Sequence, residues 1–255
     1  EKTKKQRNAA MQETKQTGEV VLITSGKGGT GKSTFAANLA SALALKGFAT
    51  AAVDANPGCR SLDLFLGLES CIIYDLADAA SGLCRLKQAM VRDKRLPETL
   101  CLLSAPQSRE KAAAGWSHEV FQELRRQFRY ILVDGPHSSG DALSALIPEA
   151  DRAVLLVCPD FASLRSADAM NRLLAGAGLS RRSFVVNQVH TELFGSPLIP
   201  GMEHMAETLR IPLAGVIPYD VNFTLAANAG SPLALEEGNY VQKNFRRIAQ
   251  NLFQV

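Results

Sequence analysis

The sequence lacks paired cysteines and any large excess of charge. Its five cysteines, at positions 59, 71, 84, 101 and 158, form no C-x-x-C or C-x-C pair, so the ligand spacing of a zinc or iron–sulfur site is missing. The 28 basic and 25 acidic residues leave a net charge of +3, which alone does not favour a nucleic-acid partner. No apolar run reaches the ~18 residues of a membrane span, and no signal-peptide pattern opens the chain. These absences predict a cytoplasmic protein with reduced thiols.

Length and apolar content favour a single folded domain. With 255 residues, 46% of them apolar, the chain is long enough to form one α/β sheet with a substantial core. Residues 1–18 are polar, include five basic residues and show no apolar periodicity. We therefore predict a disordered N-terminal tail at residues 1–18 and one domain at residues 19–255.

A buried-strand pattern, a glycine-rich turn and the start of a helix follow one another at residues 20–34. Gly26, Gly31, Lys32 and Ser33 fill the pattern G-x-x-x-x-G-K-[ST] of a phosphate-binding loop. Glycines let successive backbone N–H groups point at one anion, and the helix N-terminus adds a favourable dipole. We expect Lys32 to reach the β- and γ-phosphates of ATP and the Ser33 hydroxyl to bind Mg²⁺. The predicted phosphate-binding residues are Gly26, Lys27, Gly28, Gly29, Thr30, Gly31, Lys32, Ser33 and Thr34.

Lys27 adds a second lysine to this loop. The octapeptide Lys-Gly-Gly-Thr-Gly-Lys-Ser-Thr that it begins resembles the deviant Walker A motif of the MinD/ParA ATPases. The resemblance implies a single P-loop NTPase domain, α/β in class, with a mostly parallel twisted sheet and helices on both faces. It also implies an ATP-dependent homodimer, in which Lys27 reaches the phosphates of the partner subunit much as an arginine finger does.

An acidic residue and an asparagine follow the second predicted strand, residues 48–53. Asp54 ends that strand, and the run Asp54-x-Asn-x-Gly-x-Arg-x-Leu-Asp-Leu resembles switch I of the septum-site branch of the family. The resemblance implies that Asp54 holds the Mg²⁺ shell through water. Asn56 stands where the family normally has a second aspartate, which acts on the attacking water. An amide accepts a hydrogen bond from water but cannot take its proton. We therefore expect tight ATP binding and slow hydrolysis, whether Asn56 is natural or an introduced change.

Two further strand ends carry candidate ligands. Residues 130–136 begin with an apolar run that ends in Asp134, a Walker B pattern whose carboxylate is expected near Mg²⁺. By resemblance to the family, Asn187 bonds adenine, and the V-I-P-x-D stretch with Pro218 and Asp220 lies beside the base.

The rest of the chain predicts alternating helices and buried strands. We expect helices near residues 34–46, 116–128, 163–175 and 241–252, helical character at 72–94, and strands at 100–106, 153–159 and 184–187. The helix at 116–128 carries Trp116 on a stripe of core residues. The basic last helix packs in the core in this family, and the membrane-targeting segment comes after it. His137 is expected on an exposed loop.

The preferred interpretation is an ATP-dependent switch in septum-site placement. It implies ATP or ADP and Mg²⁺ as cofactors and regulators resembling MinC and MinE as partners. Membrane attachment, at the inner face of the cell membrane, is expected only if a C-terminal anchor exists in the full-length protein. A flagellar-number regulator of the FlhG type shares nearly every motif. A ParA-type segregation ATPase would need a basic surface. Arg181 and Arg182 alone do not make one, so DNA is not expected as a partner. A metal-cluster carrier is disfavoured by the missing cysteine pairs.

Overall fold

A single sheet organises the molecule. The computed structural model describes residues 17–108, 117–137, 139–193 and 195–255. Within these ranges, eight strands form the sheet in the order β3-β4-β2-β5-β1-β6-β7-β8, and only β3 and β4 pair antiparallel. The strands are β1 (Glu19–Thr24), β2 (Thr50–Asp54), β3 (Met90–Arg92), β4 (Leu100–Leu103), β5 (Tyr130–Asp134), β6 (Arg152–Val157), β7 (Arg182–Val189) and β8 (Leu213–Pro218).

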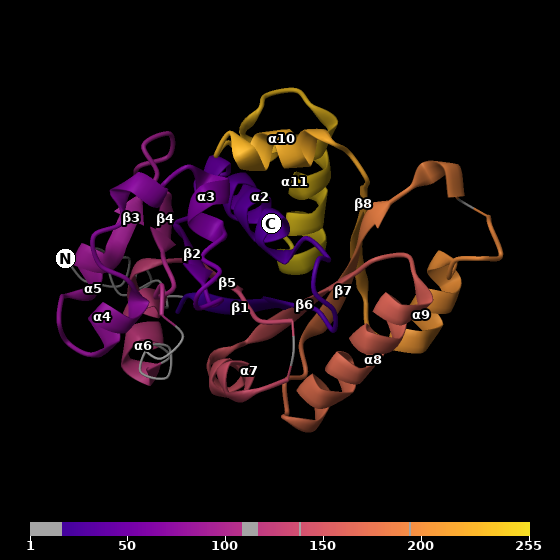
Figure 1. The fold of residues 1–255 in the computed structure, drawn as a ribbon, viewed down its shortest axis with the longest axis horizontal. Coiled ribbons are helices and arrows are strands. Elements are labelled where there is room, and N and C mark those ends of the chain that lie inside the picture. Colours follow the sequence, from indigo (N-terminus) through magenta and orange to yellow (C-terminus); the bar gives the residue numbers. More distant parts are fainter. Residues whose placement is uncertain (1–16, 109–116, 138, 194) are drawn as a thin grey trace, which may run out of the picture.

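Helices cover both faces of the sheet, which explains why its central strands are apolar runs without alternation. Val21 and Ile23 of β1 face one core, and Val20 and Leu22 face the other. Figure 1 shows α2, α10 and α11 on one side and α7, α8 and α9 on the other. The helices are α2 (Lys32–Leu45), α3 (Leu62–Leu66), α4 (Leu76–Ala80), α5 (Leu86–Ala89), α6 (His118–Gln127), α7 (Asp141–Leu146), α8 (Phe161–Gly176), α9 (Met202–Leu209), α10 (Asn222–Asn228) and α11 (Tyr240–Phe253).

Short 3-10 turns complete the connections. They are η1 (Glu69–Cys71), η3 (Ile147–Glu149), η4 (Thr191–Leu193) and η5 (Leu233–Leu235). Across the described ranges, no helix combines the length and apolar character needed to cross a bilayer.

The predicted fold class is confirmed, with one local correction. The expected helical stretch at residues 72–94 is instead two short helices, α4 and α5, followed by the edge strand β3. Gly82, at a φ of +76°, lies just beyond the end of α4, and Met90 pairs with Leu103 of β4. Pairing with the exposed edge of β4 therefore outweighs the helical pattern of this segment. Trp116, predicted on the stripe of α6, lies outside the described residues.

The topology brings three chemically important strand ends together. In the parallel register, Ile23 of β1 lies beside Asp134 of β5, and Asp54 of β2 lies beside the same Asp134. The carboxyl ends of parallel strands form the ligand-binding edge of such a sheet. The glycine-rich loop that follows β1 therefore lies next to both aspartates.

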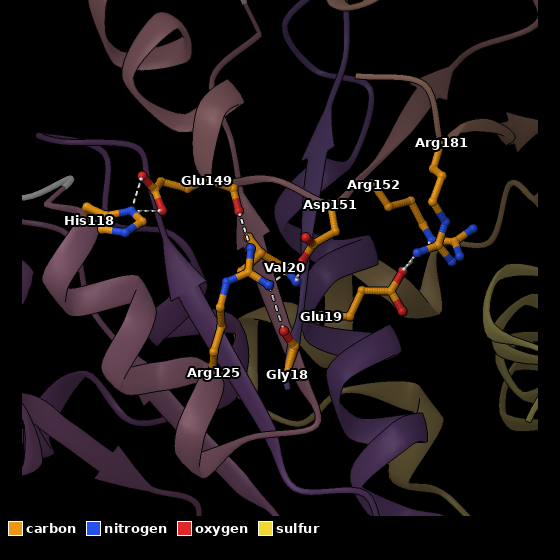
Figure 2. Close-up of polar contacts among 9 residues, drawn as sticks. All are labelled: Gly18, Glu19, Val20, His118, Arg125, Glu149, Asp151, Arg152 and Arg181. Atoms are coloured by element: carbon orange, nitrogen blue, oxygen red, sulfur yellow. Dashed lines mark hydrogen bonds and ion pairs between the residues drawn. The ribbon is translucent and has the colours of Figure 1, made fainter. Parts of the chain in front are cut away.

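A polar network closes the opposite edge, where β1 and β6 begin (Figure 2). Asp151 accepts hydrogen bonds from the backbone N–H of Val20 (2.7 Å) and from Arg125 of α6 (2.5 Å). The same guanidinium donates to the backbone oxygens of Gly18 (2.7 Å) and Glu149 (2.8 Å). Beside it, Glu19 pairs with both Arg152 and Arg181. Arg125 thus joins α6, the start of β1 and the turn before β6.

Replacing Arg125 with alanine should destabilise the fold without touching the carboxyl edge of the sheet. Hydrogen bonds to charged groups contribute about 1.5–3 kcal/mol, so we expect Arg125→Ala to lower the free energy of unfolding by about 2 kcal/mol. The measurement is urea unfolding followed by circular dichroism. Arg126→Ala, at the exposed neighbouring position of α6, is the matched control. Equal unfolding midpoints for the two variants would contradict this role.

Candidate functional site

The loop after β1 is held by two close approaches. Gly31 adopts a left-handed conformation, with φ at +84°, and a Cβ there would lie 2.4 Å from Nδ2 of Asn187. A Cβ at Gly26 would lie 2.0 Å from the backbone oxygen of Ser166 in α8. Only glycine fits at either position. Gly31 is the N-cap of α2, which begins at Lys32, so the first N–H groups of α2 are presented where phosphates bind in such loops.

The two lysines of the loop have different surroundings. Lys32 is buried, and its Nζ donates to Oγ of Ser25 (3.2 Å). Burial lowers the pKa of Lys32, while the charge of Asp134 acts in the opposite direction. Lys27 is half-exposed, with Nζ 3.6 Å from Oδ1 of Asp160. A bound anion would therefore meet the buried Lys32 and the exposed Lys27, whose ion pair is with the partly exposed Asp160.

Asp134 is a fully buried carboxylate. Its Oδ2 accepts a hydrogen bond from the Ser33 hydroxyl (2.5 Å), whereas its Oδ1 is buried with no hydrogen-bond partner among the described residues. Burial, and then the charge of Asp54, raises the pKa of Asp134 to about 7.

Asp54 is also buried but better satisfied. Its two oxygens accept the backbone N–H groups of Asn56 (2.8 Å) and Leu62 (3.1 Å). Burial raises the pKa of Asp54 to about 6, although these two hydrogen bonds act to lower it.

This donor set fits a magnesium ion. Mg²⁺ prefers carboxylate and hydroxyl oxygens, and Ser33, Asp54 and Asp134 supply them within one connected network. The unpartnered Oδ1 of Asp134 is a buried acceptor whose cost a cation would offset. A divalent cation would also favour the ionised forms of both aspartates.

Asn56 lies between the two aspartates. Its backbone N–H binds Asp54, and its side-chain amide donates to the backbone oxygen of Asp134 (2.9 Å). An ionised aspartate carries no hydrogen to donate there. The amide therefore fixes the start of the loop after β2 in a way that a carboxylate would not.

A cavity of about 330 Å³ opens beside the glycine-rich loop. Asn187, Pro218 and Asp220, the three predicted base contacts, all line it, as do the aromatic rings of Phe35, Phe65 and Phe223. A volume of about 300 Å³ or more with apolar walls is typical of a small-molecule site. The side-chain nitrogen of Asn187 already donates to the backbone oxygen of Thr30 (2.8 Å), so this residue also braces the loop.

Two residues of the site carry no recognisable sequence signal. Gln188 has a left-handed backbone, with φ at +57°, and its Nε2 donates to the backbone oxygen of Gly29 (3.0 Å). Ser61, just before α3, donates to the Ser33 hydroxyl (3.0 Å). His137, in contrast, is exposed, as expected.

Comparisons with known proteins find similarity over most of the chain. The CobQ/CobB/MinD/ParA nucleotide binding domain matches residues 21–233. Septum site-determining protein MinD of Bacillus subtilis is 34% identical over 238 residues, or 92% of this chain and 89% of that protein. The MinC:MinD cell division protein complex of Aquifex aeolicus contains a chain with a TM-score of 0.84 and 32% identity, over 93% of this chain and 96% of that one. MinD of Pyrococcus horikoshii, solved with Mg-ADP, has a TM-score of 0.81 and 25% identity, over 92% and 96%.

The two buried aspartates predict how stability changes with pH in the absence of nucleotide and Mg²⁺. Their folded-state pKa values of about 6 and about 7 exceed the ~3.9 of an unfolded aspartate. The folded state therefore binds more protons between these values, and the free energy of unfolding should fall as pH rises from about 4 to 7. Urea midpoints across this range measure the effect.

Asp134→Asn is the matched variant, because it removes the titration with the higher pKa. We expect its stability to decline less over the same pH range. Identical slopes for the two proteins would show that Asp134 does not titrate as described.

Proposed function

Because the chain belongs to the CobQ/CobB/MinD/ParA nucleotide-binding family, we propose that it is a MinD-like ATPase that acts in the spatial regulation of cell division. It is an ATP-dependent dimerising switch in septum-site placement, and its ATPase domain comprises residues 19–255. The observation that carries the proposal is the hydrogen bond from Ser33 to Asp134. Ser33 directly follows the glycine-rich segment that contains both Lys27 and Lys32. The relatives named MinD, at 34% identity and more, support this function over flagellar or DNA-segregation roles.

In the proposed nucleotide complex, Gly26–Thr34 surrounds the phosphates and Lys32 neutralises them. Ser33, Asp54 and Asp134 hold Mg²⁺, which when bound offsets the charge that develops on the transferring phosphoryl group. Asn187, Pro218 and Asp220 line the cavity for the base. The Mg-ADP of the P. horikoshii MinD supports this choice of nucleotide and metal.

Lys27 is proposed to serve the partner subunit. Its contact with Asp160 is long (3.6 Å), and both side chains are about half-exposed. Exposed ion pairs contribute about 1 kcal/mol or less, so Lys27 can exchange this partner for phosphates at little cost. Asp160 also accepts the N–H of Ser163 at the start of α8 (2.7 Å), so the carboxylate keeps a partner after the exchange.

Asn56 is proposed to make hydrolysis slow. The side-chain nitrogen is committed to the backbone oxygen of Asp134, which leaves the amide oxygen to orient water. Orientation without proton uptake supports binding and positioning but not general-base catalysis. The ATP-bound state is therefore long-lived.

Nucleotide state is proposed to select the partners. The A. aeolicus MinC:MinD complex supports a MinC-like partner, and a MinE-like activator would shorten the ATP-bound state. The protein is peripheral at the inner face of the cell membrane if its full-length form carries a C-terminal anchor.

Loss of Lys27 should weaken dimerisation. Truncating one partner of a buried charge pair at an interface costs about 2 kcal/mol or more, which is about 30-fold in Kd. Sedimentation with Mg²⁺ and a non-hydrolysable ATP analogue measures association of the wild type and Lys27→Ala. Lys87→Ala, at an exposed position of α5, should dimerise normally. A wild type that stays monomeric under these conditions, or a Lys27→Ala variant that associates equally well, overturns the proposal.

Placing an aspartate at position 56 should accelerate hydrolysis. General bases contribute on the order of 10²-fold or more, so single-turnover ATP cleavage should be faster in Asn56→Asp by about that factor. Asn56→Ala, which lacks any acceptor for water, should be no faster than the wild type. Equal single-turnover rates for Asn56→Asp and the wild type would refute the explanation of slow hydrolysis.

A further inference from the structure

Ser61 contacts the proposed magnesium site from a position of the run after β2 at which no residue type is specified. It is the residue before α3, and its hydroxyl donates to Oγ of Ser33 (3.0 Å). Ser33 in turn donates to Oδ2 of Asp134 (2.5 Å). The three side chains form one directed chain of hydrogen bonds that ends on the buried carboxylate.

The direction of this chain follows from the chemistry of its members. An ionised carboxylate only accepts hydrogen bonds, and a serine hydroxyl has one hydrogen and two lone pairs. With Asp134 ionised, the hydrogen of Ser33 points to Asp134, so Ser61 must be the donor to Ser33. That bond occupies one lone pair of Ser33. The single remaining lone pair then has a fixed direction.

The residues on both sides of Ser61 are held in fixed conformations. Arg60 has a φ of +40°, in the left-handed region, and its guanidinium bonds the buried Asp63 (2.7 Å). On the other side, the N–H of Leu62 binds Asp54 (3.1 Å). A non-glycine residue in this region costs about 1–3 kcal/mol, and such strain is concentrated at functional sites.

We propose that Ser61 is a positioning residue for a magnesium ligand, because its hydrogen bond fixes the direction of the one lone pair that Ser33 has left for a cation. The inference rests on the proposed function in one respect, the assignment of Ser33 as a ligand. Ser61 also joins the loop after β2 to Ser33 through this hydrogen bond.

A pair of variants isolates the hydroxyl. Ser61→Thr keeps the hydroxyl, and Ser61→Val has nearly the shape of threonine but no hydroxyl. Loss of a group that orients a metal ligand costs about 10–100-fold in metal affinity. We expect Ser61→Val to need about tenfold more Mg²⁺ than the wild type, and Ser61→Thr to match the wild type. Ser70→Ala, an exposed serine beyond α3, is the control for loss of an unrelated hydroxyl.

The measurement is the affinity for a fluorescent ATP analogue across a Mg²⁺ titration, repeated in EDTA. The proposal requires that only the Mg²⁺ midpoint shifts in Ser61→Val, with the affinity in EDTA unchanged. Equal midpoints for the valine and threonine variants overturn it, as does a parallel loss of affinity in EDTA, which would indicate a packing role. If the nucleotide affinity of the wild type does not change with Mg²⁺ concentration, Ser33 is not a magnesium ligand and the proposed metal site is refuted.

Discussion

The site depends on one buried carboxylate that the protein only half satisfies. Asp134 is surrounded by β1, β2 and the start of α2, and one of its oxygens has the Ser33 hydroxyl while the other has no partner in the described part of the chain. Burying such a group without a partner costs several kcal/mol if it stays ionised. The raised pKa of Asp134 expresses that cost. A cation is the partner that removes it, so the fold is best satisfied when the proposed site is loaded.

The remaining contacts of the site follow from this constraint. Asp54 lies beside Asp134 in the sheet. The charge of one neighbouring carboxylate disfavours ionisation of the other. The backbone N–H groups of Asn56 and Leu62 stabilise Asp54, and this pulls both ends of the loop after β2 toward the carboxylates. The loop after β1 arrives from the other side through Ser33. Both loops therefore converge on the same pair of charges, which is the arrangement that a switch responsive to phosphate and metal needs.

Sequence alone predicted the parts of this arrangement that are encoded locally. The glycine-rich loop and the strand-terminal Asp54 and Asp134 are short-range patterns. In the structure the loop lies between β1 and α2, and the two aspartates end β2 and β5, as predicted. Ser61 and Gln188 were missed, because they bond Ser33 and Gly29, which lie 28 and 159 positions away in the sequence. No motif specifies the residue type at either position. The helical prediction for residues 72–94 was wrong at its end, because the pairing of β3 with β4 is a tertiary contact that a local pattern does not encode. The sequence pattern shows which residues carry charge or permit turns. It does not show which distant side chain forms a hydrogen bond with them.

Asn56 shows how the same constraint can shape catalysis. At this position an ionised aspartate would add a third carboxylate beside Asp54 and Asp134, and it would face the backbone oxygen of Asp134 to which the asparagine now donates. The amide instead adds a hydrogen bond and no charge, so it stabilises the arrangement without metal. The same substitution removes the proton acceptor that hydrolysis would use. Under the proposed function, the asparagine that stabilises the site without metal is therefore also the residue that slows ATP hydrolysis. An activator would have to reorganise the loop after β2 to accelerate turnover.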